Sequence, residues 1–247
     1  DRNLPWWDLR GTAEIVYSET QQDVYYVNLN RVETGTNPLD GRPTYSKIST
    51  AFGDAPTLTN TSEGSELVVS LVLSRPVRAG LGFNAGYTYM DSENAFDGTS
   101  SRAVSNWQFH PTRGDIFREE NSTSSWENEH RYFLNASYRF ETGPLSHELG
   151  LFYNAESGRP YSVLMGGDPN RDGFSTNDLL YVPGGPDEVI FQDFTWEQFQ
   201  SYLSWHGIGG QGIVARNASA SPWTRRFDFH YGIELPIKVV RAQVTAD

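Results

Sequence analysis

An aspartate-rich stretch between residues 168 and 178 holds the side chains best suited to chemistry. It reads Asp-Pro-Asn-Arg-Asp-Gly-Phe and continues to a further aspartate. Oxygen donors at positions one, three and five, a glycine at six and a backbone carbonyl at seven follow the template of a calcium-binding loop. We therefore predict a calcium site whose ligands are Asp168, Asn170, Asp172, the backbone carbonyl of Phe174, and Asp178.

This stretch departs from an EF-hand at its last ligand. Position 12 is Leu179, where an EF-hand has a bidentate glutamate, so Asp178 would have to close the site. The sequence shows no flanking EF-hand helices. The alternative interpretation is a plain turn rich in Asp, Asn and Gly in a surface loop. Both interpretations place the stretch in a loop.

Other kinds of chemistry find little support. The sequence contains no H-E-x-x-H, no G-x-S-x-G and no phosphate-binding loop, so we expect a protein that is not an enzyme. Its formal net charge of −12 argues against nucleic acid as a partner, because nothing neutralises phosphates in bulk. It has no cysteine, which excludes disulfides and cysteine-based zinc sites.

The elements that position the loop are predicted from an alternation of apolar and polar residues, the strongest pattern in the chain. A period of two is typical of β-strands with one apolar face. A region with this pattern is Arg225–Leu235, where Phe227 and Phe229 alternate with Asp228 and His230. The predicted strands span Arg10–Ser18, Glu66–Ser74, Ala79–Asp91, Arg131–Phe140, His147–Glu156, Arg225–Leu235 and Lys238 to the end.

The lengths of the connections indicate what kind of β protein this is. They are alternately long (19–64, 92–126 and 158–222) and short (75–78, 141–146 and Pro236-Ile237). In an up-and-down meander, every second connection lies at the same end of the strands. All long loops then lie at one end of the sheet and all tight turns at the other. Outer-membrane barrels have this arrangement, with long extracellular loops. The sequence therefore predicts an all-β, antiparallel, up-and-down transmembrane β-barrel segment.

The seven predicted strands are too few to close a bacterial transmembrane β-barrel. Bacterial barrels use even numbers from eight upward, and an open sheet edge is not viable in lipid. We therefore expect a segment of a larger barrel that lacks strands on both sides. Its apolar face, with Phe83, Leu134 and Phe229, would contact lipid, and its polar face would line a water-filled lumen. A soluble β-sandwich, the alternative, would cover the apolar face with a second layer of the same chain.

The long connection 158–222 contains a candidate helix. Residues 193–205 have the pattern of a short amphipathic helix, in which Thr195 and Gln198 can form a capping box and Gly207 would end the helix. We expect the helix to pack the long loop over the barrel mouth. A lid or a partner-docking helix is the alternative interpretation.

Several motifs resemble a known family. Ser157–Tyr161, Gly167–Gly173 and Asn177–Pro183 are similar to the late-barrel signature of Oar-like TonB-dependent outer-membrane receptors. Further landmarks follow the family's order: Asp23–Tyr26 leading to Asn28–Asn30, Ser105–Trp107, and Arg216-Asn217 before Pro222-Trp223. The resemblance covers nearly the whole chain. It implies a 22-stranded barrel with an N-terminal plug, of which residues 1–247 would be the C-terminal portion, without the plug and the N-terminal strands.

We therefore expect a transport or receptor protein of the Gram-negative outer membrane that takes up a ligand through a plugged barrel. Its partners would be outer-membrane lipid, an extracellular ligand, and the TonB energising complex, reached through the absent N-terminal part. The alternative is a structural or adhesive outer-membrane surface protein whose loops calcium stabilises. The residues that precede this segment discriminate between the two, because a plug with a TonB-contacting segment favours uptake.

Overall fold

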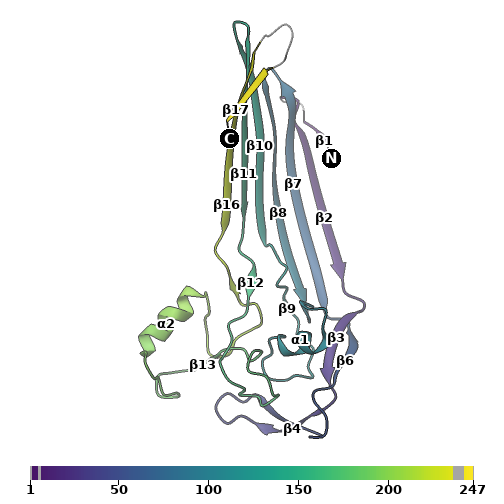
Figure 1. The fold of residues 1–247 in the computed structure, drawn as a ribbon, viewed down its shortest axis with the longest axis vertical. Helices are drawn as coiled ribbons and strands as arrows, with labels where there is room; N and C mark the ends of the chain where they lie inside the picture. Colours follow the sequence, from purple (N-terminus) through teal and green to yellow (C-terminus); the bar gives the residue numbers. More distant parts are fainter. Residues whose placement is uncertain (1, 5–6, 236–241, 247) are drawn as a thin grey trace.

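A computed structural model describes residues 2–4, 7–235 and 242–246. A tall antiparallel sheet occupies one end of the molecule, and a cluster of loops, short strands and two helices occupies the other (Figure 1). Within the described residues the sheet has nine strands in the order β1-β2-β7-β8-β10-β11-β16-β17, with β9 paired to β8. They are β1 (Arg2–Asn3), β2 (Arg10–Glu19), β7 (Gly64–Arg78), β8 (Leu81–Asn94), β9 (Ser122–Thr123), β10 (His130–Thr142), β11 (Leu145–Glu156), β16 (Thr224–Leu235) and β17 (Ala242–Ala246).

The sheet is an antiparallel meander, as predicted. Each long strand pairs with the long strand before it in the chain, and the two-residue strands β1 and β9 bring the described total to nine instead of seven. Strands β1 and β17 form its two edges and are not paired with each other in the described part of the chain. An all-β antiparallel fold is therefore confirmed, whereas closure into a 22-stranded barrel stays a prediction.

The predicted strand positions agree with six of the long strands, and most of these strands extend further. The predicted start of one strand at Ala79 is wrong, because Ala79 and Gly80 form the turn between β7 and β8. Their φ angles are 48° and 82°, the left-handed values of a tight hairpin turn. The predicted turn Pro236-Ile237 and residues 238–241 of the last predicted strand lie outside the described residues.

The register of the sheet separates polar from apolar side chains in rows that cross six strands. A row here is a set of residues paired side by side across the strands. One such row is entirely polar. A second row, offset from it by three residues in every strand, lies on the opposite face of the sheet and is mostly apolar. The polar row is Glu14, Ser70, Thr88, Arg131, Glu156 and Thr224. The opposite row is Gly11, Leu73, Ala85, Leu134, Tyr153 and Phe227. The predicted alternation therefore continues from strand to strand.

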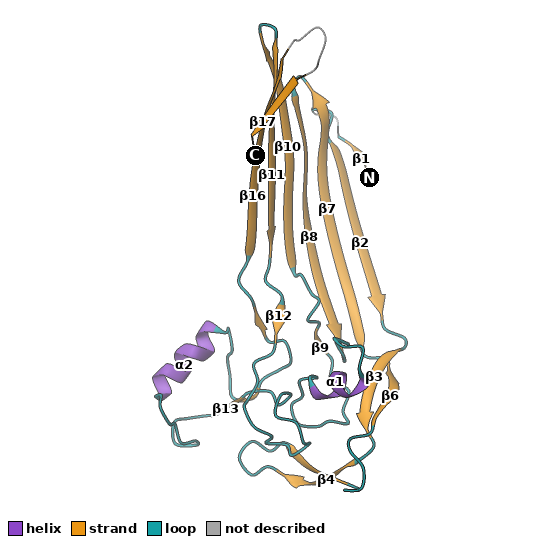
Figure 2. Ribbon diagram, viewed as in Figure 1, coloured by secondary structure: helices purple, strands orange, loops and turns teal. Residues whose placement is uncertain are grey.

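Neither face of the sheet is covered by a second layer in the described part of the chain (Figure 2). Phe227 is 65% exposed and Phe229 is 51% exposed, and in the nine strands only Ala155 is a buried apolar residue. The core lies in the loop cluster instead. Tyr45, Trp107 and Ile116 form one buried group there. A second buried group consists of Val163, Val182, Leu203 and Ile208. The second layer that a sandwich requires is absent from the described residues.

The three long connections meet at one end of the sheet, as the alternation of loop lengths predicts (Figure 2). They contain regular structure, of which the sequence predicts only the helix in the third connection. The elements are β3 (Asp23–Asn28), β4 (Arg31–Thr36), β5 (Pro43–Lys47), β6 (Pro56–Thr61), α1 (Ala103–Gln108), β12 (Pro160–Tyr161), β13 (Tyr181–Val182), α2 (Trp196–Trp205), β14 (Gly212–Ile213) and β15 (Ser219–Ala220).

Helix α2 confirms the helix prediction in detail. Thr195 is its N-cap, and the reciprocal capping box with Gln198 is present. The chain leaves the helix at Gly207, whose φ is +69°. Leu203, on the buried side of the helix, packs against Val163 and Val182, so the helix anchors part of its own loop. No helix in the described part of the chain is both long and apolar enough to span a bilayer.

Candidate metal centre

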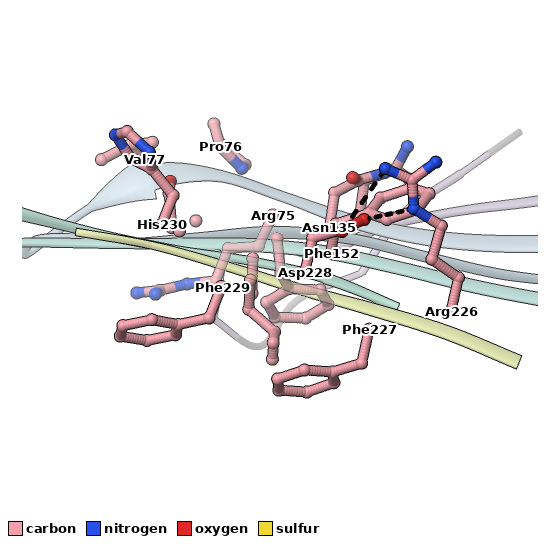
Figure 3. A pocket seen from close by; sticks show the side chains of 17 residues that line it. Arg75, Pro76, Val77, Asn135, Phe152, Arg226, Phe227, Asp228, Phe229 and His230 are labelled. Carbon is pink, nitrogen blue, oxygen red and sulfur yellow. Dashed lines mark hydrogen bonds and ion pairs between the residues drawn. The ribbon is translucent and has the colours of Figure 1, made fainter. Parts of the chain in front are cut away.

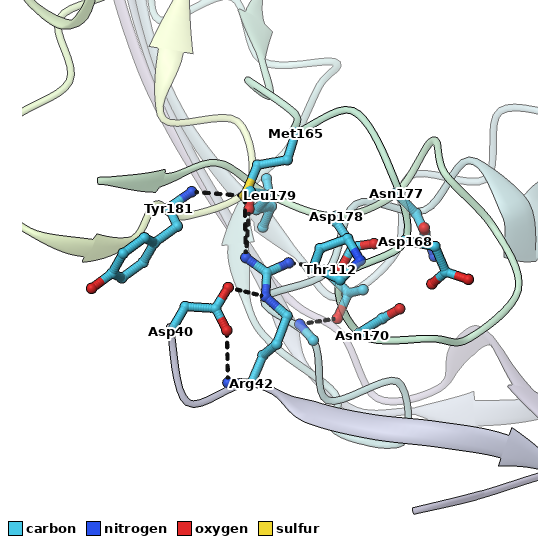
Figure 4. A network of polar contacts seen from close by, with 12 residues as sticks. Asp40, Arg42, Thr112, Met165, Asp168, Asn170, Asn177, Asp178, Leu179 and Tyr181 are labelled. Carbon is cyan, nitrogen blue, oxygen red and sulfur yellow. Dashed lines mark hydrogen bonds and ion pairs between the residues drawn. The ribbon is translucent and has the colours of Figure 1, made fainter. Parts of the chain in front are cut away.

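The predicted calcium loop is held in the interior of the loop cluster. Asn170, Asp172 and Asp178 have no exposed surface, and Asn177 is 2% exposed. Figure 4 shows Asp168, Asn170, Asn177 and Asp178 of this loop near Arg42 of the first long connection. Burial of so many polar groups is costly unless each has a partner, so their contacts decide what the loop can do.

Asp172 is the polar centre of the loop. Its Oδ1 accepts a hydrogen bond from the backbone amide of Phe174 at 2.9 Å. Its Oδ2 accepts from Nδ2 of Asn177 at 2.7 Å and from Nδ2 of Asn170 at 3.3 Å. Asn170 in turn accepts the backbone amide of Asp172 at 3.0 Å. These contacts fold the loop on itself, as the Asp, Asn and Gly pattern predicts.

Asp168 and Asp178 are the first and last predicted ligands. In each of them, only one of the two carboxylate oxygens has a hydrogen-bond partner. Asp168 accepts the backbone amide of Gly173 through Oδ2, at 3.0 Å. Asp178 accepts Nη1 of Arg42 through Oδ1, at 2.7 Å. The second oxygen of each, Oδ1 of Asp168 and Oδ2 of Asp178, is buried and has no hydrogen-bond partner. A hard cation is one group that such oxygens can bind.

Phe174 was predicted to contribute its backbone carbonyl. In the structure, the backbone amide of Phe174 donates a hydrogen bond to the carboxylate of Asp172. The Phe174 ring packs against the buried group of Tyr45, Trp107 and Ile116. The ring therefore ties the loop to the core of the loop cluster. Its carbonyl has no ligand role that the described contacts support, so this part of the ligand set stays a prediction.

Arg42 is a further residue of this site, which the sequence does not predict. Its Nε bonds Asp40 at 2.6 Å, its Nη1 bonds Asp178, and its Nη2 donates to the backbone carbonyl of Leu179 at 3.1 Å. The arginine side chain is fully buried. No local sequence signal could have revealed it, because 136 residues separate Arg42 from Asp178.

Two other long connections hold the loop through backbone hydrogen bonds. From the first connection, the amide of Tyr45 donates to the carbonyl of Asn170 at 2.8 Å. From the second, the amide of Thr112 donates to the carbonyl of Asn177 at 2.7 Å, and the amide of Leu179 donates back to Thr112 at 3.1 Å. The predicted metal loop is therefore the point where all three long connections meet.

The charges around the loop do not balance. Asp40, Asp172 and Asp178 are buried carboxylates, and Arg42 is the buried cation that contacts two of them. Burial raises the pKa of Asp178 to about 7, against the opposing effect of Arg42, and the carboxylates of Asp172 and Asp168 add to the increase. Burial likewise raises the pKa of Asp172, although three hydrogen bonds oppose it. With all of these carboxyls ionised, the site would carry more negative charge than Arg42 alone compensates.

The predicted ligands lie in one loop, but their carboxylates alone do not form a complete coordination sphere for a metal ion. Across the described residues, no three Asp, Glu, His or Cys side chains are placed to hold a metal ion by themselves. A cation here would therefore also need amide or backbone oxygens, which calcium accepts. Whether calcium binds stays a prediction.

Comparison with known proteins adds no relative. No protein-family model matches the chain, and neither a curated protein nor a solved structure matches it.

Proposed function

We propose that this chain is a membrane-spanning segment of an outer-membrane receptor barrel, with its three long connections on the extracellular side. The observation that carries the proposal is the single-layer sheet, whose mostly apolar rows are exposed on one face. Figure 3 shows the arrangement on β16, where Phe227 and Phe229 point to one side and Arg226 and His230 to the other. An exposed apolar face of this extent requires a partner, and lipid is the partner that suits strands of this length.

The strand lengths support the same proposal. Strands β2, β7, β8, β10, β11 and β16 have 10 to 15 residues. A tilted transmembrane strand needs about 9–11 residues. The polar row on the opposite face needs no buried partners if it borders a water-filled lumen. The meander also places every long connection at one end, which is how such barrels present their extracellular loops.

The proposed activity is TonB-dependent uptake of an extracellular ligand, without enzymatic chemistry. The resemblance of the loop motifs to Oar-like receptors supports this part of the proposal. The structure adds that the loops form a folded unit with its own core, which is suited to present a binding surface. The energising contact with TonB would belong to the plug, outside these 247 residues.

The membrane placement can be tested with a matched pair of positions on β16. The 247 residues contain no cysteine, so Phe229→Cys and Asp228→Cys each add one thiol to this segment. Phe229 is 51% exposed and the Asp228 side chain 47% exposed, so a fluorophore at either site starts from similar accessibility. The complete protein, reconstituted in vesicles, would be labelled and then quenched by spin-labelled lipid chains.

We expect strong quenching of a fluorophore at position 229 and weak quenching at position 228. A water-soluble quencher should show the reverse order. Equal quenching at both positions by the lipid quencher would contradict the proposed placement.

The uptake activity has a separate test against the alternative of a structural or adhesive surface protein. Cells that lack TonB would be compared with parent cells for entry of peptides and oligosaccharides that bind the purified protein. A receptor loses uptake without TonB while surface binding persists. A structural protein gives the same result in both strains.

A further inference from the structure

We infer that the 168–178 loop binds one calcium ion through the carboxylates of Asp168 and Asp178, and that this ion holds the three long connections together. The inference does not depend on the membrane placement, because it concerns contacts within the loop cluster alone. It assigns the closing ligand to Asp178 and gives Arg42 a positioning role that the sequence does not reveal.

The first argument is the pair of unsatisfied oxygens. Oδ1 of Asp168 and Oδ2 of Asp178 are buried and lack hydrogen-bond partners, whereas the other oxygen of each carboxylate is bonded. Both oxygens belong to the residues at the two ends of the calcium-type motif. Oδ1 of Asn177, in the same loop, is also buried without a partner. Buried oxygens are nearly always satisfied in folded proteins, so three from one loop indicate a missing partner. A hard cation such as calcium is a partner that such oxygens bind.

The second argument is the uncompensated charge. Asp40 and Asp178 share the single guanidinium of Arg42, and Asp172 receives only neutral donors. Ionised buried carboxylates are strongly disfavoured without a nearby positive charge, so a bound cation would stabilise the ionised forms of Asp172 and Asp178. Because each carboxylate oxygen has two acceptor positions, the bonds that Asp172 already makes leave it able to ligate a metal as well.

The chemistry of the donors selects calcium. The loop offers carboxylate, amide and backbone oxygens, and the stretch contains no histidine and no cysteine. Oxygen-only sites suit calcium and magnesium. Magnesium demands near-ideal octahedral geometry and keeps several waters, whereas calcium accepts irregular sets of six to eight oxygens. An irregular, closely packed loop therefore favours calcium.

The contacts of the loop explain how an ion there would act on its neighbours. Arg42 and Tyr45 from the first connection, and Thr112 from the second, bond to residues inside the metal loop. Asn37 adds a bond from its Nδ2 to the carbonyl of Pro169 at 3.2 Å. The acceptors of these bonds belong to the 168–178 loop. An ion that orders the loop therefore also restrains hairpin β4–β5 and the residues that follow α1.

The experiment measures calcium binding to the complete protein in detergent by titration calorimetry. The Asp168→Asn variant keeps the size and one oxygen of the side chain, so the hydrogen bond to Gly173 can persist. The control is Asp187→Asn, which changes an exposed aspartate in the same connection. Magnesium chloride serves as the comparison ion.

We expect the parent protein and Asp187→Asn to bind calcium alike, and Asp168→Asn to lose one site or bind it at least tenfold more weakly. Magnesium should not displace the ion at equal concentration. An Asp168→Asn isotherm that is identical to the parent would overturn the site.

Hydrogen exchange measures whether calcium at this loop also orders the neighbouring connections. Adding calcium to the parent protein should slow exchange in residues 168–178 and also in hairpin β4–β5. Asp168→Asn should lose both effects and still show parent-like exchange in β10 and β11, which controls for its folding. Slowing that is confined to residues 168–178 would overturn the coupling between the connections.

Discussion

Arg42 and Asp178 form an ion pair of 2.7 Å in which neither side chain has any exposed surface. The two residues come from the first and third long connections of the sheet, 136 residues apart. Arg42 also bonds Asp40 and the backbone of Leu179, so one guanidinium organises the centre of the loop cluster. The pair shows that these connections fold as a unit, with buried polar contacts of the kind found in protein interiors.

Replacing Arg42 should loosen this centre. Arg42→Gln leaves Asp178 buried without its charged partner, which typically costs about 3–5 kcal/mol. Limited proteolysis of residues 158–222 should therefore become much faster. The control is Arg113→Gln, which breaks a partly exposed pair with Glu120 and should cost less than about 1 kcal/mol. Equal protease resistance of the two variants would contradict the role of Arg42.

A second inter-connection contact should respond to acid. Burial opposes ionisation of Asp97, but the charge of Arg216 at 2.6 Å and hydrogen bonds from Ser125, Asn94 and Asn217 hold the pKa of Asp97 below its ordinary value. A carboxyl with a lowered pKa in the folded state stabilises that state above its unfolded pKa of about 4, and the stabilisation is lost as the pH falls through the folded value. Acidification below about pH 4 should therefore weaken this contact.

The measurement is hydrogen exchange of residues 92–126 and 158–222 between pH 3 and pH 7, corrected for intrinsic rates. The Asp97→Asn variant should exchange faster at pH 7, because Arg216 is left buried without a charged partner. Its protection should also depend less on pH than that of the parent. Parallel pH profiles for parent and variant would show that Asp97 does not carry the effect.

Gly158 should tolerate no side chain at the start of the third connection. A Cβ at this position would lie 1.7 Å from the backbone carbonyl oxygen of Ser221, closer than any real contact. Gly158→Ala should therefore separate β12 from β15 and lower the melting temperature of the loop cluster. Gly166→Ala is the matched control, because nothing lies within 4 Å of its Cβ position. Similar melting of both variants would contradict the close approach.

The capping box should account for much of the order at the start of α2. Thr195 accepts the amide of Gln198 at 3.3 Å, and Gln198 accepts the amide of Thr195 at 2.8 Å. Thr195→Ala should cost the helix about 1 kcal/mol, whereas Thr195→Ser keeps the acceptor and should cost little. Hydrogen exchange of the first turn of the helix measures the difference. Equal exchange in the two variants would show that the hydroxyl is dispensable.

The sequence alone determined the long strands, the turn-rich loop of Asp and Asn residues and the capped helix. All three depend on neighbours within a few residues: an alternation of period two, Asp and Asn beside Gly, and Thr three residues before Gln. The alternating loop lengths also placed the three connections at one end of the sheet, because a meander leaves no other arrangement. Residue order along the chain was sufficient for each of these predictions.

Only the tertiary structure decided which connections touch and which polar groups share a buried space. Arg42 beside Asp178, Thr112 beside Asn177 and the core around Trp107 depend on how distant segments pack, and no local pattern encodes that packing. The paired short strands inside the first connection were not predicted for the same reason. Tyr25 of β3 bonds the carbonyl of Arg118 in the second connection, and Tyr45 of β5 bonds the carbonyl of Asn170 in the third.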